Sequence, residues 1–358
     1  DGIFNGEVVN DYGTITGGTF NGVVTSYVTI SEGAISGIIV TYQVNGAHYA
    51  TQIVPSGSTA IKPVDPINSA GAEFLGWDKD DGTKWDFNTA VTENTTLMGW
   101  MYVPVISENA LLNALSGSAE VIRLTGDIDI SSSLTVNRTV TLDLNNHVLT
   151  ITGENSFITV SGQNTTLTLT DSAETKTERK FRINQDGTWV PDENGDKTVS
   201  GGVITGGTGT NGPNGIRGGG GVYVAEGGKF TMNGGNIAGC TVRASKGLAL
   251  GGGVYVAKDG EFTMTDGSIA GCTAQATSDD SGYAWGGGIR SEGTTTLSGR
   301  AEIRDCHAKG DSSRAGGGIS NGNGHLTISG NVTITGCTAD GQSDAVFLFY
   351  GGSISGGT

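Results

Sequence analysis

The four cysteines have the most regular spacing among the residues that could do chemistry. Cys240, Cys272, Cys306 and Cys337 are separated by 32, 34 and 31 residues, and each lies three residues after an isoleucine. If successive repeats stack, equivalent α-carbons lie about 4.8 Å apart, within disulfide range, but parallel side chains suit the disulfide dihedral poorly. A straight column also cannot surround zinc tetrahedrally. We therefore predict reduced cysteines stacked inside the fold, with disulfides or a metal site as alternatives.

Acidic residues form three groups that could bind calcium or transfer protons. Residues 78–82 depart from the ligand spacing of an EF-hand loop, and residues 192–196 have the composition of a tight surface turn. Asp279 and Asp280 could act as the acid/base pair of a polysaccharide hydrolase. However, the strings Asn-Thr-Asp, Gly-His-Gly and Arg-Ile-Lys that should accompany such a pair are absent. We therefore predict no catalytic residue, no metal site and no cofactor.

A column of aromatic and basic side chains is the best candidate for ligand binding. In two Val-Tyr-Val triplets, the alternation of a strand turns the valines inward and Tyr223 and Tyr255 outward. Arg290 and Ser320 continue this column, and Trp285 comes just before it. Flat rings beside an arginine suit the C–H faces and hydroxyls of sugars. We predict that Tyr223, Tyr255, Trp285 and Arg290 bind a glycan, with ordinary cross-strand pairing as the alternative.

An internal repeat predicts the elements that position these residues. Gly-Gly-Gly-Val-Tyr-Val occurs at 219–224 and 251–256, and looser copies occur at 286–291 and 316–321. Each copy continues through two more apolar stretches with period-two alternation before it reaches its cysteine. Each repeat therefore predicts three short strands separated by glycine-rich turns.

Stacking of these repeats predicts a parallel β-solenoid. One repeat cannot bury its apolar side, whereas stacking pairs every strand with its equivalents above and below. The 62 glycines among 358 residues fit the corners of such a fold, because glycine reaches positive φ without steric cost. The alternative is a β-sandwich, which gives no reason to repeat the same residue at the same position.

Composition and charge exclude several classes of protein. The 6 prolines and the irregular glycine spacing exclude collagen. With 35% hydrophobic and 16% charged residues, the chain should fold, and it has no continuous apolar stretch of membrane-spanning length. The formal charge of −16 opposes binding to nucleic acid and to anionic lipid. We expect no nucleic-acid partner and no membrane insertion.

A helix is predicted at 107–117, where Ser107 is a natural N-cap and Gly117 can end the helix. Strand-like segments follow from 121 to 144. The helix therefore stands at the start of the solenoid, where we expect it to cover the open end.

The second part of the chain resembles a known superfamily. A short helix is followed by VIRLTGDIDI, LTVNRTVTLDLNNHVLTI and glycine-rich repeats ending in NIAGCTV or SIAGCTA. This order resembles the right-handed β-helices of the pectate-lyase-like superfamily, especially the non-enzymatic polymorphic outer-membrane repeats of bacterial surfaces. The resemblance covers roughly 104–358 and implies a right-handed parallel β-helix. In that type an asparagine usually stands where this chain has cysteine.

Residues 37–103 carry a second and more specific resemblance. Their motifs are Val-Thr-Tyr at 40–42, Phe-Leu-Gly-Trp at 74–77, Trp-Asp-Phe at 85–87 and Val-Thr-Glu-Asn-Thr-Thr-Leu at 91–97. This string resembles the Listeria–Bacteroides repeat, the internalin B-repeat module of bacterial surface proteins. The resemblance implies a small β-grasp-like α+β module. We expect Trp77 and Trp100 in or near its core.

The first 36 residues contain another short repeat. The string at 2–9 recurs at 18–24 with an offset of 16 residues. We therefore predict three domains: short β-solenoid repeats at 1–36, the B-repeat-like module at 37–103, and the parallel β-helix with its capping helix at 104–358. Repeats at both ends lead us to expect that the chain is a fragment of a longer protein.

Two classes of function fit these features. The first is a non-catalytic bacterial surface protein with an adhesion or scaffold role, whose repeats present a long side surface to a host or matrix glycan or to a surface protein. The second is a polysaccharide lyase or glycoside hydrolase on the same fold. The missing catalytic strings and the B-repeat-like module favour the first. We expect the chain in the extracellular space or cell wall of a bacterium.

Overall fold

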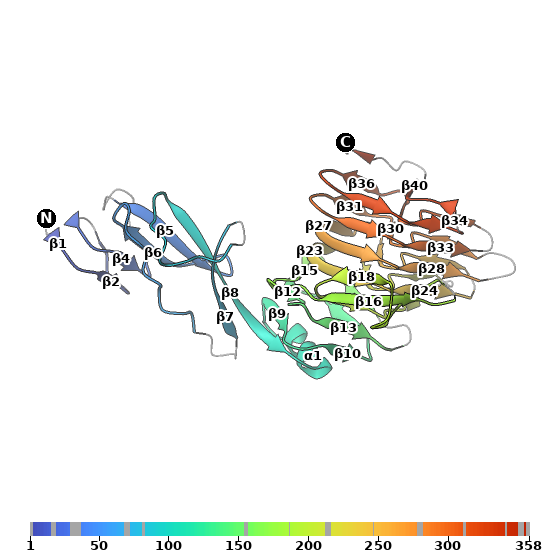
Figure 1. Ribbon diagram of the computed structural model, residues 1–358, viewed down its shortest axis with the longest axis horizontal. Helices are drawn as coiled ribbons and strands as arrows, with labels where there is room; N and C mark the ends of the chain where they lie inside the picture. The colour runs from blue at the N-terminus through green and yellow to red at the C-terminus, as the bar shows by residue number, and fades with distance from the viewer. Residues whose placement is uncertain are drawn as a thin grey trace. The chain divides into compact units, whose positions relative to one another are not determined.

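The computed structural model consists of two compact units, Asp1–Val103 and Pro104–Thr358. Both are built mainly from strands, and α1 (Glu108–Ser116) is the one helix among the described residues (Figure 1). The described residues are 3–15, 19–28, 37–67, 72–80, 83–153, 157–185, 187–211, 216–245, 247–277, 282–310, 313–340, 342–349 and 354–355.

The first unit contains eight strands in its described part. They are β1 (Ile3–Phe4), β2 (Val8–Asn10), β3 (Thr19–Phe20), β4 (Val24–Ser26), β5 (Ile38–Val44), β6 (Ala47–Val54), β7 (Glu73–Lys79) and β8 (Thr95–Val105). The parallel pairs β1–β3 and β2–β4 join residues 16 apart, as the short repeat predicts. Strand β4 then pairs antiparallel with β6, so the strands of 1–36 belong to the same compact unit as the module that follows.

The core of the first unit lies on the strands β5 to β8. Strand β6 pairs with β5, β5 pairs in parallel with β8, and β8 pairs with β7. Tyr42 and Trp77 are buried and meet edge to face, with ring centroids 4.9 Å apart. Trp100 is 37% exposed, so the expectation that it lies in the core is wrong. In strand β8 it alternates with the buried Leu97 and Met101 and points outward.

The described residues of 37–103 form strands and connections without a helix, so the α part of the expected α+β module has no counterpart among them. The long connection from β6 to β7 carries Pro55, Pro63 and Pro66. Proline lacks the backbone N–H and clashes with the preceding helical turn. These prolines oppose a helix in that connection.

The second unit holds four series of parallel strands. The first is β9 (Val121–Leu124), β12 (Val140–Asp143), β15 (Thr165–Thr170), β23 (Gly228–Ala238), β27 (Glu261–Ala270), β31 (Thr294–Leu297), β36 (His325–Ile328) and β41 (Ile354–Ser355). The second is β10 (Ile128–Ile130), β13 (Val148–Ile151), β19 (Val203–Thr205), the shared β23 and β27, β32 (Glu302–Arg304) and β37 (Thr333–Thr335). None of the sheets formed by the described strands closes into a barrel.

The other two series flank these sheets. The third is β11 (Leu134–Val136), β14 (Ile158–Val160), β22 (Val222–Val224), β26 (Val254–Val256), β30 (Ile289–Ser291), β35 (Ile319–Asn321) and β40 (Val346–Leu348). The fourth comprises two separate sheets. One holds β21 (Ile216–Gly218), β25 (Leu248–Leu250), β29 (Tyr283–Trp285) and β34 (Ser313–Ala315), and the other holds β24 (Thr241–Ala244), β28 (Thr273–Ala276), β33 (His307–Gly310) and β38 (Thr338–Ala339). Strands β20 (Thr210–Asn211) and β39 (Gln342–Ser343) add antiparallel edges.

Strand pairing in the second unit follows the sequence repeat. The chain passes from β26 through β27, β28 and β29 before it returns to the third series at β30, which pairs with β26 in parallel. In Figure 1 the labelled strands β12, β15, β23, β27, β31 and β36 succeed one another in chain order, from green to red. Equivalent residues therefore meet, as in the stacked Phe230 and Phe262, whose ring centroids are 5.2 Å apart. This side-chain stacking buries apolar residues such as Phe230 and Phe262 between successive repeats.

Each glycine of the Gly-Gly-Gly string at 251–253 is required for a different physical reason. Gly251 adopts φ +62°, which an L side chain rarely tolerates. A side chain on Gly252 would collide with the backbone of Gly287 in the next repeat. A Cβ on Gly253 would lie 3.3 Å from the sulfur of Cys272. The string therefore forms a corner where neighbouring repeats and the cysteine approach closely.

Helix α1 packs its apolar side on the first strands of the second unit. Ser107 is the N-cap, with its hydroxyl accepting from Ala110 N at 3.3 Å, as predicted. Leu111 and Leu115 are buried, and the helix touches β9, β10 and β11. At the C-terminal end, Arg138 donates to the carbonyl of Leu115 at 2.9 Å, which satisfies a helix-end acceptor.

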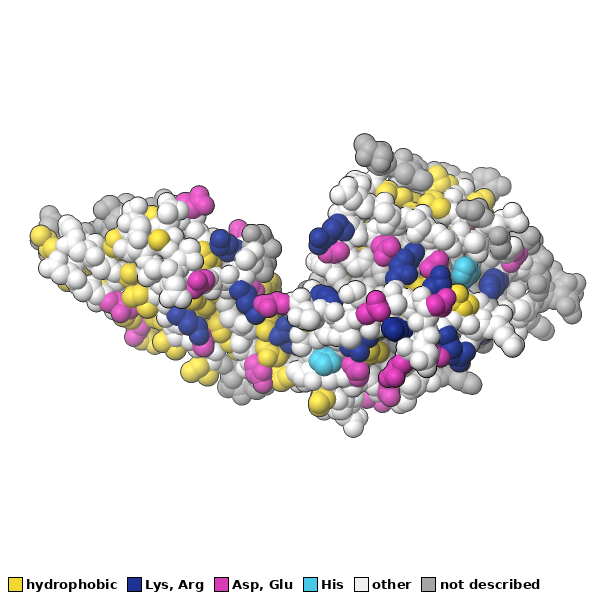
Figure 2. Space-filling model, in the orientation of Figure 1, with side chains coloured by type: hydrophobic (Ala, Val, Ile, Leu, Met, Phe, Trp, Pro, Cys, Tyr) yellow, Lys and Arg dark blue, Asp and Glu magenta, His cyan; other side chains and the backbone are white. Residues whose placement is uncertain are grey.

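An antiparallel sheet lies against one side of the stacked strands. It consists of β16 (Glu178–Ile183), β17 (Trp189–Pro191) and β18 (Lys197–Ser200). Its Phe181 and Trp189 are buried against Val203, Ala238 and Ala270. The segment 192–196, expected to be a surface turn, connects β17 to β18. On the side shown in Figure 2, basic and acidic side chains are interspersed.

Candidate functional site

The predicted outward column lies in the third strand series. Tyr223, Tyr255, Arg290 and Ser320 are register partners in β22, β26, β30 and β35. The rings of Tyr223 and Tyr255 stack with centroids 5.4 Å apart and an angle of 28° between their planes. The flanking valines are fully buried, so these side chains do point away from the core. Tyr223 is half-buried, but Tyr255 is only 9% exposed.

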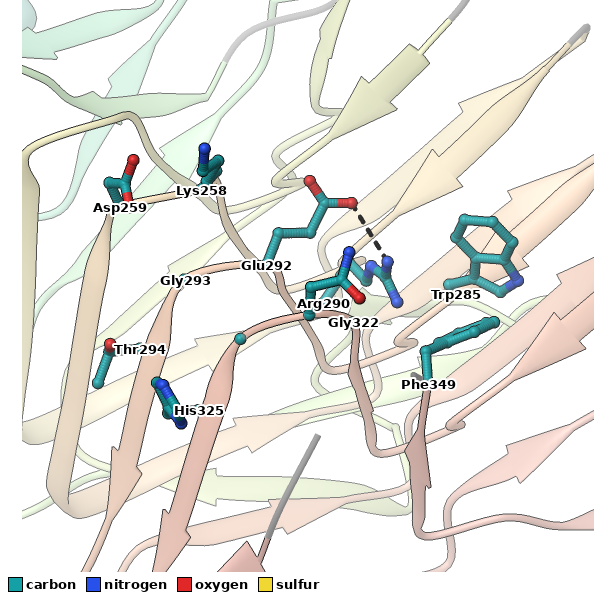
Figure 3. Close-up of a pocket in the computed structure, with 12 residues that line it drawn as sticks. Lys258, Asp259, Trp285, Arg290, Glu292, Gly293, Thr294, Gly322, His325 and Phe349 are labelled. Carbon is teal, nitrogen blue, oxygen red and sulfur yellow. Dashed lines mark hydrogen bonds and ion pairs between the residues drawn. The ribbon is translucent and has the colours of Figure 1, made fainter. Parts of the chain in front are cut away.

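Arg290 points away from the core but is not open to solvent. Only 5% of it is exposed, because aromatic rings cover its guanidinium group. The guanidinium carbon lies 4.9 Å from the ring centroid of Trp285 and 5.0 Å from that of Phe349. Figure 3 shows the group beside both rings. Arg290 therefore lies in the outward column with its guanidinium covered by aromatic rings.

The polar contacts of Arg290 use both terminal nitrogens of its guanidinium group. Nη1 donates to Ser320 Oγ at 2.9 Å, and Nη2 donates to Glu292 Oε1 at 3.2 Å. Its Nε is buried and has no hydrogen-bond partner in the described structure. Burial lowers the pKa of Arg290, while the charge of Glu292 acts against this shift. The arginine thus ties together two adjacent strands and their following turn.

Glu292 connects the arginine to the tyrosines. The hydroxyl of Tyr255 donates to Glu292 Oε2 at 3.0 Å, so both carboxylate oxygens accept hydrogen bonds. Burial raises the pKa of Tyr255, and the negative charge of Glu292 raises it further. Tyr255 therefore stays protonated as the donor across the physiological pH range.

A groove lies beside this network, with a volume of about 590 Å³. It is lined by Trp285, Arg290, Glu292 and Phe349, together with Lys258, Asp259, Gly293, Thr294, Gly322, Asn323, Gly324 and His325. Of the four predicted site residues, only Trp285 and Arg290 line it. The charged and polar side chains of the rim, among them Lys258, Asp259 and His325, are exposed. The groove therefore combines aromatic walls with a rim of mixed donors and acceptors (Figure 3).

The sequence analysis missed two central residues of this groove. Glu292 lies two positions after Arg290, and period-two alternation could have placed it on the same side. Phe349 follows β40 at the far end of the repeat series, and no local pattern connects it with Trp285. Only the return of the chain to the third series brings Phe349 within 5.0 Å of the Trp285 ring.

The cysteines are all free and buried, as the sequence predicted. Cys272 lies 3.6 Å from the carbonyl oxygen of Ile237 and 3.5 Å from that of Ala270. Burial is the main cause that raises the pKa of Cys272 and of Cys306. His307 belongs to β33, half-buried, and its Nδ1 lies 2.8 Å from Thr338 Oγ1. These thiols fill space in the core.

The acidic groups give no metal centre in the part of the chain that is described. There, no three His, Cys, Asp or Glu side chains are grouped so that they could hold an ion. Asp279 and Asp280, the possible acid/base pair, lie outside the described residues. Asp192 instead accepts from Asn194 N at 2.9 Å, which is the bond of a tight turn.

Comparison with known proteins identifies one segment. No curated protein and no solved structure matches the chain. Within the described residues, no helix is long and apolar enough to cross a membrane. Residues 39–99, the strands β5 to β8 and their connections, match the family model of the Listeria-Bacteroides repeat domain, a repeat typical of bacterial surface proteins.

Proposed function

We propose that this chain is a non-catalytic bacterial surface protein with an adhesion or scaffold role, located in the extracellular space or cell wall. The groove beside Trp285 carries the proposal that it binds a glycan. The Listeria-Bacteroides repeat at 39–99 supports the surface location, because such repeats are typical of bacterial surface proteins. The alternative is a polysaccharide lyase or glycoside hydrolase.

We also propose that the second unit is a right-handed parallel β-helix, that is, a β-solenoid. The in-register parallel pairs and the passage of the chain from β26 through β27, β28 and β29 to β30 support this architecture. A solenoid exposes a long side surface that nearest-neighbour stacking keeps stiff. Such a surface suits contact with an extended partner.

The chemistry of the groove suits sugars. The ring centroids of Trp285 and Phe349 are 5.0 Å apart, and both rings line the groove. Exposed Thr294, Asn323 and His325 supply hydrogen-bonding groups at the rim. Ligand sites generally combine such apolar walls with a few placed polar groups. Tyr223 and Tyr255 continue the outer column beside the groove.

An enzyme would need a carboxylate of the groove as acid or base, and the groove has two: Asp259 on the exposed rim and Glu292 beside Arg290. Both oxygens of Glu292 accept hydrogen bonds, from Tyr255 and from Arg290. A carboxylate held in this way is poorly suited to donate a proton to a leaving group. This contact set favours binding over hydrolysis.

A glycan array tests the proposal directly. We expect the purified chain to be retained by at least one polysaccharide, and we expect Trp285→Ala to abolish that retention. Trp100→Ala, which removes a partly exposed tryptophan of the other unit, is the matched control and should leave retention unchanged. Retention by no glycan would contradict the binding role. Unsaturated products or new reducing ends from polyuronides or glycosaminoglycans would instead support the enzyme.

A further inference from the structure

The groove beside Trp285 contains equal numbers of acidic side chains and of lysine and arginine. Lys258 and Asp259 are neighbours on the exposed rim, and Arg290 is paired with Glu292 at 3.2 Å. Because each of these two cations lies beside a carboxylate, the groove presents no cationic patch to a ligand. The formal charge of −16 adds a general repulsion of polyanions.

Arg290, the most buried cation of the groove, is poorly placed to bind an acidic group. Recognition of a carboxylate or sulfate by arginine uses two parallel N–H donors on one edge of the guanidinium. Here Nη1 and Nη2 already donate to Ser320 and Glu292, and Nε is buried. The aromatic rings of Trp285 and Phe349 stand beside the guanidinium.

The arrangement around Arg290 leaves little room for it to turn toward a ligand. A Cβ on Gly322 would lie only 2.7 Å from Arg290 Nη2, so the backbone of the next turn stands close to this donor. The side chain of Glu292 is 36% exposed beside it. An acidic sugar entering the groove would therefore meet a carboxylate before it met the arginine.

From these contacts we infer that the groove selects an uncharged glycan and excludes polyuronides and sulfated glycans, an inference that rests on the proposed glycan-binding function. Hydroxyl groups both donate and accept hydrogen bonds, so they match a rim that mixes Lys258, Asp259, Asn323 and Thr294. The C–H groups of an uncharged ring can pack on Trp285 and Phe349. The ion pair of the buried Arg290 with the partly exposed Glu292 adds no net charge to the groove.

Titration calorimetry with hexasaccharides of matched length tests this inference. The probes are cellohexaose and mannohexaose as uncharged chains, and hexagalacturonate and a hyaluronate hexasaccharide as acidic chains. At 50 mM salt, we expect at least one uncharged chain to bind ten times more tightly than either acidic chain. Asn323→Ala, at an exposed position, should weaken that binding several-fold without changing the unfolding midpoint.

The substitution Glu292→Gln removes the negative charge of this side chain and keeps its shape. We expect it to raise the affinity for hexagalacturonate at least five-fold relative to the affinity for the uncharged chain, because it removes the carboxylate and weakens the hold on Arg290. Glu261→Gln, which removes an exposed charge paired with Lys229, is the matched control and should change neither.

The results separate the inference that the groove selects uncharged glycans from the proposal that it binds glycans at all. Acidic chains that bind as tightly as uncharged ones, or a Glu292→Gln variant that gains nothing, would overturn the inference and leave glycan binding intact. Failure of all four hexasaccharides, together with no retention on a glycan array, would overturn glycan binding and the inference with it.

Discussion

Arg290 demonstrates that a side chain can point away from the core and still be buried. Strand alternation places it in the same outward column as Tyr223 and Tyr255. The rings of Trp285 and Phe349 cover its guanidinium group, which donates hydrogen bonds to Ser320 and Glu292. The buried guanidinium therefore stabilises the surface on which we propose that a ligand binds.

The hydroxyl of Tyr255 contributes to folding through Glu292. Tyr255→Phe removes this hydrogen bond and should lower the free energy of unfolding by about 1 kcal/mol, since bonds to charged groups contribute about 1.5–3 kcal/mol and Glu292 is partly solvated. Urea unfolding followed by circular dichroism measures the change. Tyr223→Phe is the control, because the described residues give its hydroxyl no hydrogen bond, and an equal loss there would contradict the role of the Glu292 contact.

The raised pKa of Tyr255 predicts a loss of stability at alkaline pH. The folded protein holds the phenol protonated, whereas the unfolded chain ionises it near its ordinary pKa of 10.0. The contribution is therefore fully present below pH 10 and declines as the pH rises above it, by up to about 1.4 kcal/mol per pH unit. Tyr255→Phe should show a correspondingly shallower decline in urea unfolding between pH 10 and 11. Parallel curves for the two proteins would contradict the shift.

The four buried cysteines predict slow thiol chemistry in the folded protein. Burial raises the pKa of Cys272 and Cys306, so little reactive thiolate forms at neutral pH. Titration with a thiol reagent at pH 8 without reductant should find four groups after denaturation and almost none before it. Two or no groups in the denatured chain would indicate disulfides.

At the scale of the repeat, the second glycine of each Gly-Gly-Gly string has no space for a side chain, because backbone atoms lie close to it. Gly252 approaches the backbone of Gly287 and of Thr273, and a methyl group there has no space. Gly252→Ala should therefore lower the free energy of unfolding by about 1–3 kcal/mol, because the stacked backbones must move apart. Thermal unfolding measures this loss. Gly6→Ala, where no atom lies within 4 Å of the added Cβ, should change nothing and serves as the control.

The antiparallel sheet β16–β17–β18 is a second kind of element, which no repeat predicts. Trp189 of β17 is buried, and the charged groups of Lys197 and Arg304 lie 5.7 and 5.3 Å from its ring. Gly271 touches the same ring so closely that a Cβ would overlap it. The absence of a side chain at Gly271 thus leaves the space that the Trp189 ring fills.

At the scale of the whole molecule, the two compact units predict two separate unfolding events. Each unit has its own buried core, around Tyr42 and Trp77 in the first and around the stacked Phe230 and Phe262 in the second. Fragments 1–103 and 104–358 should each unfold cooperatively, at midpoints close to the two transitions of the intact chain. Calorimetry of the three proteins provides the comparison. A single transition that is lost in both fragments would show that the units fold as one.

The proposed surface role also belongs to the scale of the whole molecule. The Listeria-Bacteroides repeat at 39–99 is typical of bacterial surface proteins. The stacked second unit adds a long side surface with a groove of about 590 Å³. A rigid carrier with a shallow polar and aromatic groove fits attachment better than turnover, which is the basis of the proposed adhesion or scaffold role.

The sequence by itself determined everything that depends on local pattern or on recurrence. Period-two alternation identified the strands, the capping residue Ser107 marked the start of α1, and the spacing of the cysteines predicted free, buried thiols. The register of Tyr223, Tyr255 and Arg290 followed in the same way, because repeats of nearly equal length must stack equivalent residues. The motifs at 40–97 identified the matched module.

Only the tertiary structure decided which of these residues are accessible. Phe349 and Trp285 meet because the chain returns to the same strand series after a full repeat, and sequence distance gives no measure of that contact. Their rings bury Arg290, and Glu292 forms an ion pair with it, whereas the sequence placed Arg290 only on the outward side of its strand. Strand alternation fixes only the direction of a side chain, while burial depends on every segment that packs over it.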